Sequence, residues 1–142
     1  MRNIQVIPGI MITIMLLLLI SCEKEKPLGE AIIGKWEVES MKVITYESNV
    51  KKAEATVYLE ANEMKYQFIE GGSGIFWDED EDYLFSWTLT GSQLTISDLF
   101  EEDLVANASV DGDILTWTYK ENDPQIPARS YESVMTAKRT SK

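Results

Sequence analysis

The stretch YLFSWTLTGSQLTIS, residues 83–97, decides the fold of this chain. In its first half a large apolar or aromatic side chain occupies every second position, and the positions between are mostly serine or threonine. Gly91-Ser92 interrupts this alternation, which then resumes with Leu94 and Ile96. A period of two residues is typical of a strand that buries one face. The short glycine-containing break between two such runs therefore predicts a β-hairpin.

The same pattern continues outward from this hairpin in both directions. Further alternating runs predict strands at residues 32–46, 55–60, 64–68, 75–77, 104–110, 114–119 and 131–138. The first of these runs changes phase between Val38 and Met41, so we expect a β-bulge near Ser40-Met41. Asp111-Gly112 is the strongest turn signal, and we expect it to supply the two central residues of a type I′ turn.

These runs predict an all-β chain of eight or nine strands. Short connections favour antiparallel neighbours. A meander of this length has two bare edges unless it closes on itself. We therefore expect an antiparallel up-and-down β-barrel of about eight strands. No sustained helical spacing appears after Lys26.

The N-terminal region has a different character. Arg2 is the only charge before an apolar run from Ile10 to Ile20, which is shorter than the roughly 20 residues that cross a bilayer. A short charged start and a short apolar run predict a cleaved secretory signal peptide at residues 1–21. An uncleaved N-terminal membrane anchor is the alternative.

Leu19-Ile20-Ser21-Cys22 resembles the lipobox of bacterial lipoproteins. The resemblance implies that Cys22 becomes the first residue and carries diacylglycerol on its sulfur and an acyl chain, such as palmitate, on its amine. Several acyl chains hold a protein stably on a membrane without spanning it. The implied location is the outer membrane of a Gram-negative cell, facing the periplasm or the cell surface. Residues 22–31 are expected to be a flexible tether, and residues 32–140 the folded domain.

Composition excludes several classes of chemistry. The 142 residues include 24 Asp and Glu, 13 Lys and Arg, one Cys and no His. Without histidine there is no Ser-His-Asp triad and no Cys-His pair, and no zinc site can be built from His and Cys. A net charge of −11 argues against nucleic acid, whose phosphates are bound by Lys and Arg. We expect no cofactor, and we expect the protein not to be an enzyme, because its carboxylates cluster in loops and no pair stands out.

Gly34-Lys35-Trp36, at the start of the first strand, resembles the signature of the lipocalins. The stretch Trp87 to Ile96 and the closing run Tyr131 to Arg139 extend the resemblance to short bacterial lipocalin-like lipoproteins. It covers roughly Ile32 to Arg139. It implies a barrel whose closed end is plugged by Trp36, with Arg139 or Lys138 stacked on the indole.

The lipocalin resemblance also implies a cavity for a small apolar ligand at the end opposite Trp36. The candidate lining residues share the phase expected to face the barrel interior: Tyr66, Phe68, Phe85, Trp87, Trp117 and Tyr119. The alternative is that so many bulky side chains fill the barrel and leave no cavity.

Asp78 to Asp82 form the acidic run DEDED. The spacing of Asp78, Asp80 and Asp82 matches the start of an EF-hand loop, but Tyr83 and Leu89 replace the glycine and glutamate that the motif requires. A loose calcium site shared with residues 101–103 and a solvated acidic turn both remain open as interpretations.

Two functions therefore stay open. The first is a lipid-anchored envelope protein that binds a small hydrophobic ligand. The second is an interaction or inhibitor module whose acidic loops engage a basic protein partner, which the sequence does not identify. An open cavity would favour the first, and a filled barrel with one acidic rim would favour the second.

Overall fold

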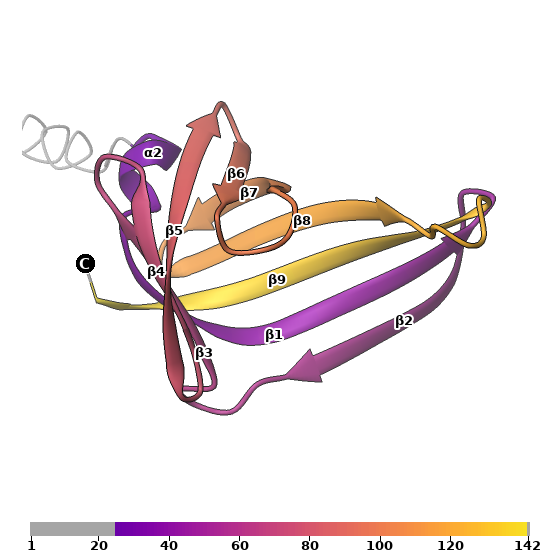
Figure 1. Ribbon diagram of the computed structural model, residues 1–142, viewed down its shortest axis with the longest axis horizontal. Coiled ribbons are helices and arrows are strands. Elements are labelled where there is room, and N and C mark those ends of the chain that lie inside the picture. The colour runs from indigo at the N-terminus through magenta and orange to yellow at the C-terminus, as the bar shows by residue number, and fades with distance from the viewer. Residues whose placement is uncertain (1–24, 142) are drawn as a thin grey trace, which may run out of the picture.

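The computed structural model describes residues 25–141, which form nine strands and one helical turn (Figure 1). The elements are α2 (Leu28–Ala31), β1 (Gly34–Glu47), β2 (Val50–Tyr58), β3 (Met64–Ile69), β4 (Ser73–Asp78), β5 (Glu81–Thr90), β6 (Gln93–Ser97), β7 (Leu104–Asp111), β8 (Ile114–Asn122) and β9 (Arg129–Ser141). The predicted signal peptide and Cys22 lie outside the described residues. Within residues 25–141 no helix has the length and apolar character needed to span a membrane.

The strands form a closed antiparallel barrel, as the sequence predicted. The sheet order is β2-β1-β3-β4-β5-β6-β7-β8-β9, and β1 also pairs with β9. That last pairing, which sets Trp36 opposite Arg139, closes eight strands into a ring. β2 stands outside the ring and pairs only with β1.

One apolar cluster fills the barrel. The fully buried side chains include Trp36, Tyr66, Phe68, Leu94 and Trp117. All members of the cluster come from residues 32–137, so the described domain contains its whole core. Their spacing is the two-residue alternation of the sequence, because every second residue of a barrel strand faces inward.

The predicted change of phase in β1 is confirmed. Val38 pairs with Ala137 but Ser40 pairs with Thr136, so the register with β9 shifts by one residue at this point. The shift corresponds to a β-bulge, which puts Met41 rather than Ser40 on the inner side. Without it, Lys42 would face the barrel interior.

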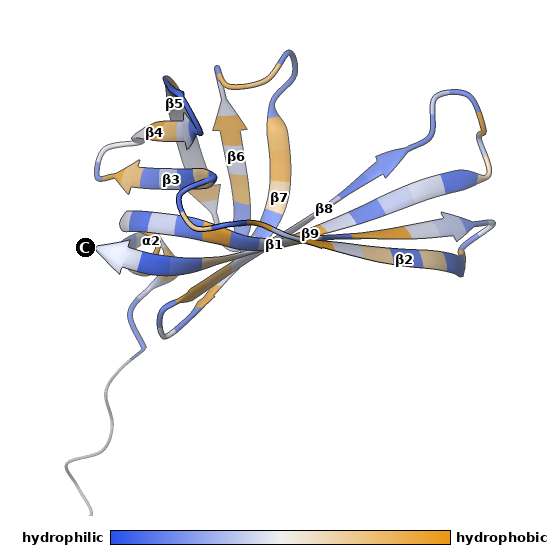
Figure 2. Ribbon diagram, turned by 90° about the horizontal axis from the view of Figure 1, so that it is seen from below, coloured by the Kyte–Doolittle hydropathy of each residue, from blue (hydrophilic) through white to orange (hydrophobic). Residues whose placement is uncertain are grey.

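Beyond this bulge the sheet leaves the barrel. Residues 42–58 of β1 and β2 and residues 118–134 of β8 and β9 form a four-stranded extension, which we call the arm (Figure 1). It projects from the barrel and carries hydrophilic residues at its far end (Figure 2). Every residue of β2 is exposed to solvent.

The sequence prediction misplaced the start of β2. The strand begins at Val50 rather than Ala55, after a tight turn at Ser48-Asn49. Both turn residues have positive φ, 49° and 64°, as a type I′ turn requires. Alternation could not reveal the first half of β2, because a strand exposed on both faces needs no apolar residues.

One other turn also differs from expectation. Asp111 pairs with Ile114, so Gly112-Asp113 rather than Asp111-Gly112 is the central pair, and only Gly112 has positive φ. The DEDED run forms the solvated acidic turn that was one of its two interpretations, because all five residues are exposed. Asp78 pairs with Glu81 across a two-residue turn, so the outer carboxylates of the run belong to β4 and β5.

The predicted tether also contains more structure than expected. Residues 28–31 form the helical turn α2, in which Leu28 packs against the barrel core. Ile32, directly after it, is fully buried. The packed domain therefore begins near Leu28.

Candidate ligand-binding pocket

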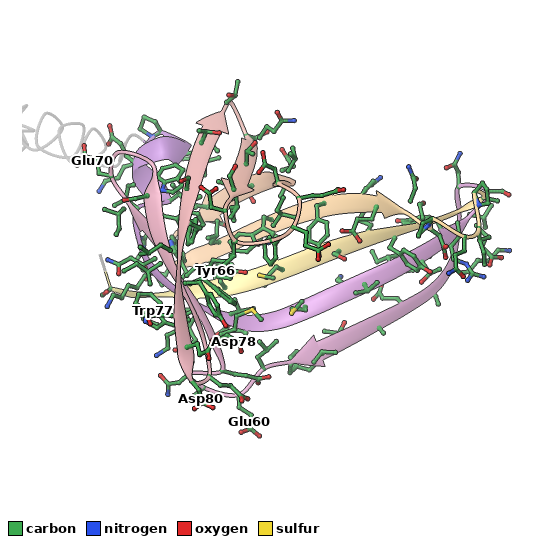
Figure 3. All side chains as sticks on the ribbon, viewed as in Figure 1. Glu60, Tyr66, Glu70, Trp77, Asp78 and Asp80 are labelled. Atoms are coloured by element: carbon green, nitrogen blue, oxygen red, sulfur yellow. The ribbon has the colours of Figure 1, made fainter. Side chains whose placement is uncertain are left out.

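Because the antiparallel strands alternate in direction, each turn between strands can be assigned to one of the two ends of the barrel. β1 and β3 run oppositely, so the β3–β4 turn at residues 70–72 lies at the Trp36 end, with α2. The β4–β5 turn and the loop 98–103 lie at the other end. Figure 3 shows Glu70 near α2, and Glu60 and Asp80 at the opposite end.

Trp36 closes the first of these ends. Its side chain is fully buried, and its indole N–H donates to the carbonyl of Ile32 at 2.7 Å. A buried indole usually places its one N–H donor against an acceptor. The chain just ahead of β1 supplies that acceptor and so folds over the indole.

Arg139 lies over the same indole, with the guanidinium carbon 4.1 Å from the ring centroid. It donates to the carbonyls of Ala31 at 2.6 Å and Ile33 at 2.8 Å. Ala31 ends α2 and Ile33 follows it, so the cation satisfies carbonyl acceptors at a helix end. This is the stacking of Arg139 on Trp36 that the lipocalin resemblance implies, and Lys138 is instead exposed.

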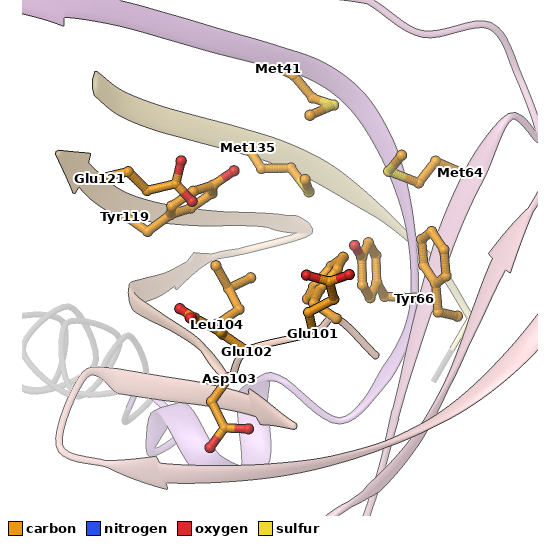
Figure 4. A pocket seen from close by; sticks show the side chains of 12 residues that line it. Met41, Met64, Tyr66, Glu101, Glu102, Asp103, Leu104, Tyr119, Glu121 and Met135 are labelled. Carbon is orange, nitrogen blue, oxygen red and sulfur yellow. The ribbon is translucent and has the colours of Figure 1, made fainter. Parts of the chain in front are cut away.

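The opposite end holds a pocket of about 430 Å³ (Figure 4). Such a volume falls within the roughly 300–1,000 Å³ of small-molecule sites. Apolar and aromatic side chains from six strands and the 98–103 loop line most of it, and carboxylates line the rest. The twelve lining residues are Met41, Met64, Tyr66, Phe76, Phe100, Glu101, Glu102, Asp103, Leu104, Tyr119, Glu121 and Met135.

The six predicted lining residues divide into two groups. Tyr66 and Tyr119 line the pocket. Phe68, Phe85, Trp87 and Trp117 are buried in the core and lie outside the pocket lining. The barrel is therefore filled at its Trp36 end and open at the other, so both alternatives stated for the interior apply to part of it.

The rings of Phe85, Trp87 and Trp117 each pack edge to face against Phe68. The Phe68 ring lies 5.5 Å from that of Phe85 and 5.6 Å from that of Trp87, at interplanar angles of 77° and 86°. Trp87 donates its indole N–H to the carbonyl of Ser73 at 2.8 Å. The Phe85 ring covers Gly74, where a Cβ would overlap it. A close-packed cluster of this kind leaves no room for a ligand.

Tyr66 forms the boundary between this filled core and the pocket. Its ring packs perpendicular to Trp117 at 5.0 Å and lies 4.7 Å from Phe76. Although Tyr66 is only 2% exposed, its side chain contributes to the pocket wall. Burial raises the pKa of Tyr66 well above its usual value, with smaller contributions from Tyr119 and the Asp78 carboxylate. The phenol therefore stays protonated at neutral pH.

Carboxylates gather around the mouth of the pocket. Glu101, Glu102 and Asp103 come from the loop before β7, and Glu121 comes from β8. The DEDED turn lies at the same end of the barrel, where Figure 3 shows Asp78 and Asp80, although none of its residues lines the pocket. We call the carboxylates of both segments and Glu121 the rim. No lysine or arginine is among the twelve lining residues. The rim therefore presents negative charge to a molecule entering the pocket.

The calcium interpretation of Asp78, Asp80 and Asp82 finds no structural support. In residues 25–141 no three acidic side chains are grouped in a way that could hold a metal ion. Alternate residues of a strand point to opposite faces, and a two-residue turn separates Asp78 from Glu81.

The sequence pattern did not predict several of the residues that line the pocket. They are mainly unbranched or isolated apolar side chains: Met41, Met64, Phe100, Leu104 and Met135, together with Glu121. The change of phase in β1 was the signal that could have indicated Met41. Methionine adapts to irregular gaps and is frequent on surfaces that accept varied ligands, so three of them at one pocket suit a binding role.

Comparison with known proteins gives one family. A family model described as a lipocalin-like domain matches residues 32–117, more than half of the chain. The match runs from the residues before β1 into β8, and so spans most of the barrel. No curated protein and no solved structure matches significantly.

Proposed function

The chain belongs to the lipocalin-like domain family, and from this premise we propose that it is a binding protein for a small apolar ligand rather than an enzyme. The pocket of about 430 Å³ at the open end of the barrel carries the proposal. Its wall combines three methionines with aromatic and leucine side chains. Ligand sites are typically concave, mostly apolar and provided with a few polar groups.

The architecture supports this role because the packed end of the barrel, which holds Trp36, is separate from the open end, which holds the pocket. The aromatic core and the Trp36–Arg139 contact fix the closed end. The pocket wall can then accept a ligand without loss of the fold. A mouth surrounded by loops and strand ends gives direct access from solvent.

A pocket-filling substitution tests the proposal. In Leu104→Trp the indole should occupy the pocket, whereas Val105→Trp places the same side chain at an exposed position on the next residue of β7. A neutral alcohol such as decanol, or a sterol or quinone, should raise the melting temperature of the wild-type protein and of Val105→Trp by mass action. Leu104→Trp should abolish the shift. If all three proteins respond alike, or none responds to any ligand, the pocket is not a binding site.

We further propose that Cys22 anchors the protein by lipid to the outer membrane of a Gram-negative cell. The lipobox-like LISC sequence after a short apolar run supports this. Wild-type protein should incorporate labelled palmitate and partition with membranes. Cys22→Ala should do neither, and palmitate label retained by that variant would contradict the assignment.

The acidic rim gives a second candidate function, which is the engagement of a basic protein. It is favoured by the gathering of the DEDED turn and residues 101–103 at one end. Binding of that kind should weaken steeply with salt and disappear when Asp78 to Asp82 are neutralised. Leu104→Trp should leave the binding of a basic protein unchanged, whereas it should abolish the binding of a ligand in the pocket.

A further inference from the structure

All the charged side chains that line the pocket are negative. The lining contains four carboxylates, from Glu101, Glu102, Asp103 and Glu121, and no cationic side chain. The full chain carries a net charge of −11, so the field of the whole molecule has the same sign as the local one. A fatty acid carboxylate entering this pocket would meet only like charge, whereas a cation would be attracted.

One polar group of the pocket wall has no partner within the protein. The Tyr66 side chain is only 2% exposed, and its hydroxyl points into the pocket (Figure 4). Tyr131 donates to Asp123 and Trp87 donates to Ser73, whereas no side chain or carbonyl among the described residues takes that role for Tyr66. The indole N–H of Trp117 also lacks an acceptor in residues 25–141, but it is sealed in the packed core. The Tyr66 hydroxyl instead faces the pocket, where a bound molecule can supply the hydrogen bond.

The raised pKa of Tyr66 keeps its oxygen protonated and neutral. A phenol oxygen that carries its proton can still accept a hydrogen bond from an ammonium N–H. The nearby Asp78 and rim carboxylates add attraction for the same group. The remaining wall, with Met41, Met64 and Met135, offers apolar contact to a hydrocarbon chain.

We infer that the ligand of this pocket is an amphiphilic amine, with its protonated amino group facing the Tyr66 hydroxyl and the mouth carboxylates and its apolar part against the methionine wall. The inference rests on the proposed function of the pocket. It narrows the ligand class from any small apolar molecule to one that carries a positive charge.

Three probes with the same chain length test the charge preference. Decylamine, decanol and decanoate are titrated below their micelle concentrations into protein from residue 23 onward, which contains the whole core. At neutral pH and low salt decylamine should bind about tenfold more tightly than decanol, and decanoate most weakly. Added salt should weaken decylamine alone.

Matched variants separate the pocket carboxylates from overall charge. Glu101→Gln/Glu102→Gln/Glu121→Gln removes three carboxylates at the mouth. Glu30→Gln/Glu70→Gln/Asp111→Asn removes three exposed ones at the other end. The first variant should bring decylamine and decanol to within about twofold of each other, and the second should keep most of the tenfold preference. Equal effects of both variants would overturn a local charge site.

Tyr66→Phe tests the hydroxyl. It should weaken decylamine about tenfold and leave decyltrimethylammonium, which has no N–H, unchanged. If decylamine is unaffected, the amino group does not lie at Tyr66 and the proposed orientation is wrong. If decanol binds as well as decylamine to the wild-type protein, the charge preference is wrong although the pocket still binds ligands. If none of the probes binds, the proposed function itself fails.

Discussion

The barrel and the arm share three strands but are held together by different forces. In the barrel, β1, β8 and β9 bury one face against an aromatic core. In the arm the same strands continue with little burial, and Ile44 is the arm's one buried side chain, at 9% exposed. One strand can therefore pass from a region stabilised by apolar burial to one stabilised by backbone pairing and polar contacts.

Charged and polar pairs across strands hold the far end of the arm. Arg129 pairs with Glu47 at 2.6 Å, and Tyr131 donates to Asp123 at 2.8 Å. Arg129 holds the pKa of Glu47 below its usual value, chiefly through their hydrogen bond. Exposed pairs of this kind contribute little each, about 0–1 kcal/mol. The arm is thus expected to open locally long before the barrel unfolds.

The largest expected effect is at the closed end of the barrel. Trp36→Ala removes a fully buried indole and the surface on which Arg139 stacks. It should lower the free energy of unfolding by ~3–5 kcal/mol, as large core truncations do. Denaturant titration measures the change. A loss below about 1 kcal/mol would show that the barrel does not depend on its core in the way described.

The next effect concerns close packing at Gly74. Alanine there would overlap the Phe85 ring, so Gly74→Ala should destabilise the protein by ~1–3 kcal/mol through overpacking. Gly29→Ala is the matched control, because its added Cβ meets only Leu89 at an ordinary 3.9 Å. Thermal melts of the two variants measure the difference. Similar melting temperatures would mean that the core yields easily at Phe85.

Alkaline pH should weaken the barrel through Tyr66. The folded pKa of this phenol is raised, so its contribution is complete below the unfolded value of about 10 and is lost as pH rises beyond that value. The loss is about 1.4 kcal/mol per pH unit above 10. Tyr66→Phe should flatten this part of the stability curve. Tyr58→Phe, on the exposed arm, should retain it, and identical curves for both variants would contradict the assignment.

The smallest global effect is expected in the arm. Arg129→Met removes the contacts to Glu47 and Asp123 and should change the free energy of unfolding by less than about 1 kcal/mol. Amide hydrogen exchange should nevertheless accelerate at residues 43–57 and 119–133 and stay unchanged in β4–β7. Accelerated exchange throughout the barrel would show that the two regions form one cooperative unit.

This difference in forces explains which parts of the fold could be predicted. Alternation located the barrel strands and the bulge after Val38, since both follow from which residues are buried. Closure was predicted from the two unpaired edges that an open meander would leave. It did not locate the first half of β2, where Lys51 and Lys52 occupy a strand with no buried face. The turn at Ser48-Asn49 lacks the glycine that usually marks a hairpin.

The candidate site could be predicted only in part. Tyr66 and Tyr119 were identified by their phase, but phase alone does not distinguish the packed end of a barrel from its open end. Phe68, Phe85, Trp87 and Trp117 share that phase and belong to the packed core. Their depth along the barrel axis depends on register and strand length, which arise from tertiary pairing rather than from local sequence.

The pairing that closes the ring also dictates an order of folding. Lys35 lies opposite Ser141 and Trp36 opposite Arg139, so β1 cannot complete its pairing before β9 is available. The hairpins around Ser48-Asn49 and Gly112-Asp113 can form early, because their contacts are local. Until β9 is available, one edge of β1 has no strand to pair with. A chain truncated before residue 139 should therefore remain an open, protease-sensitive meander in which Arg139 does not cover the Trp36 indole.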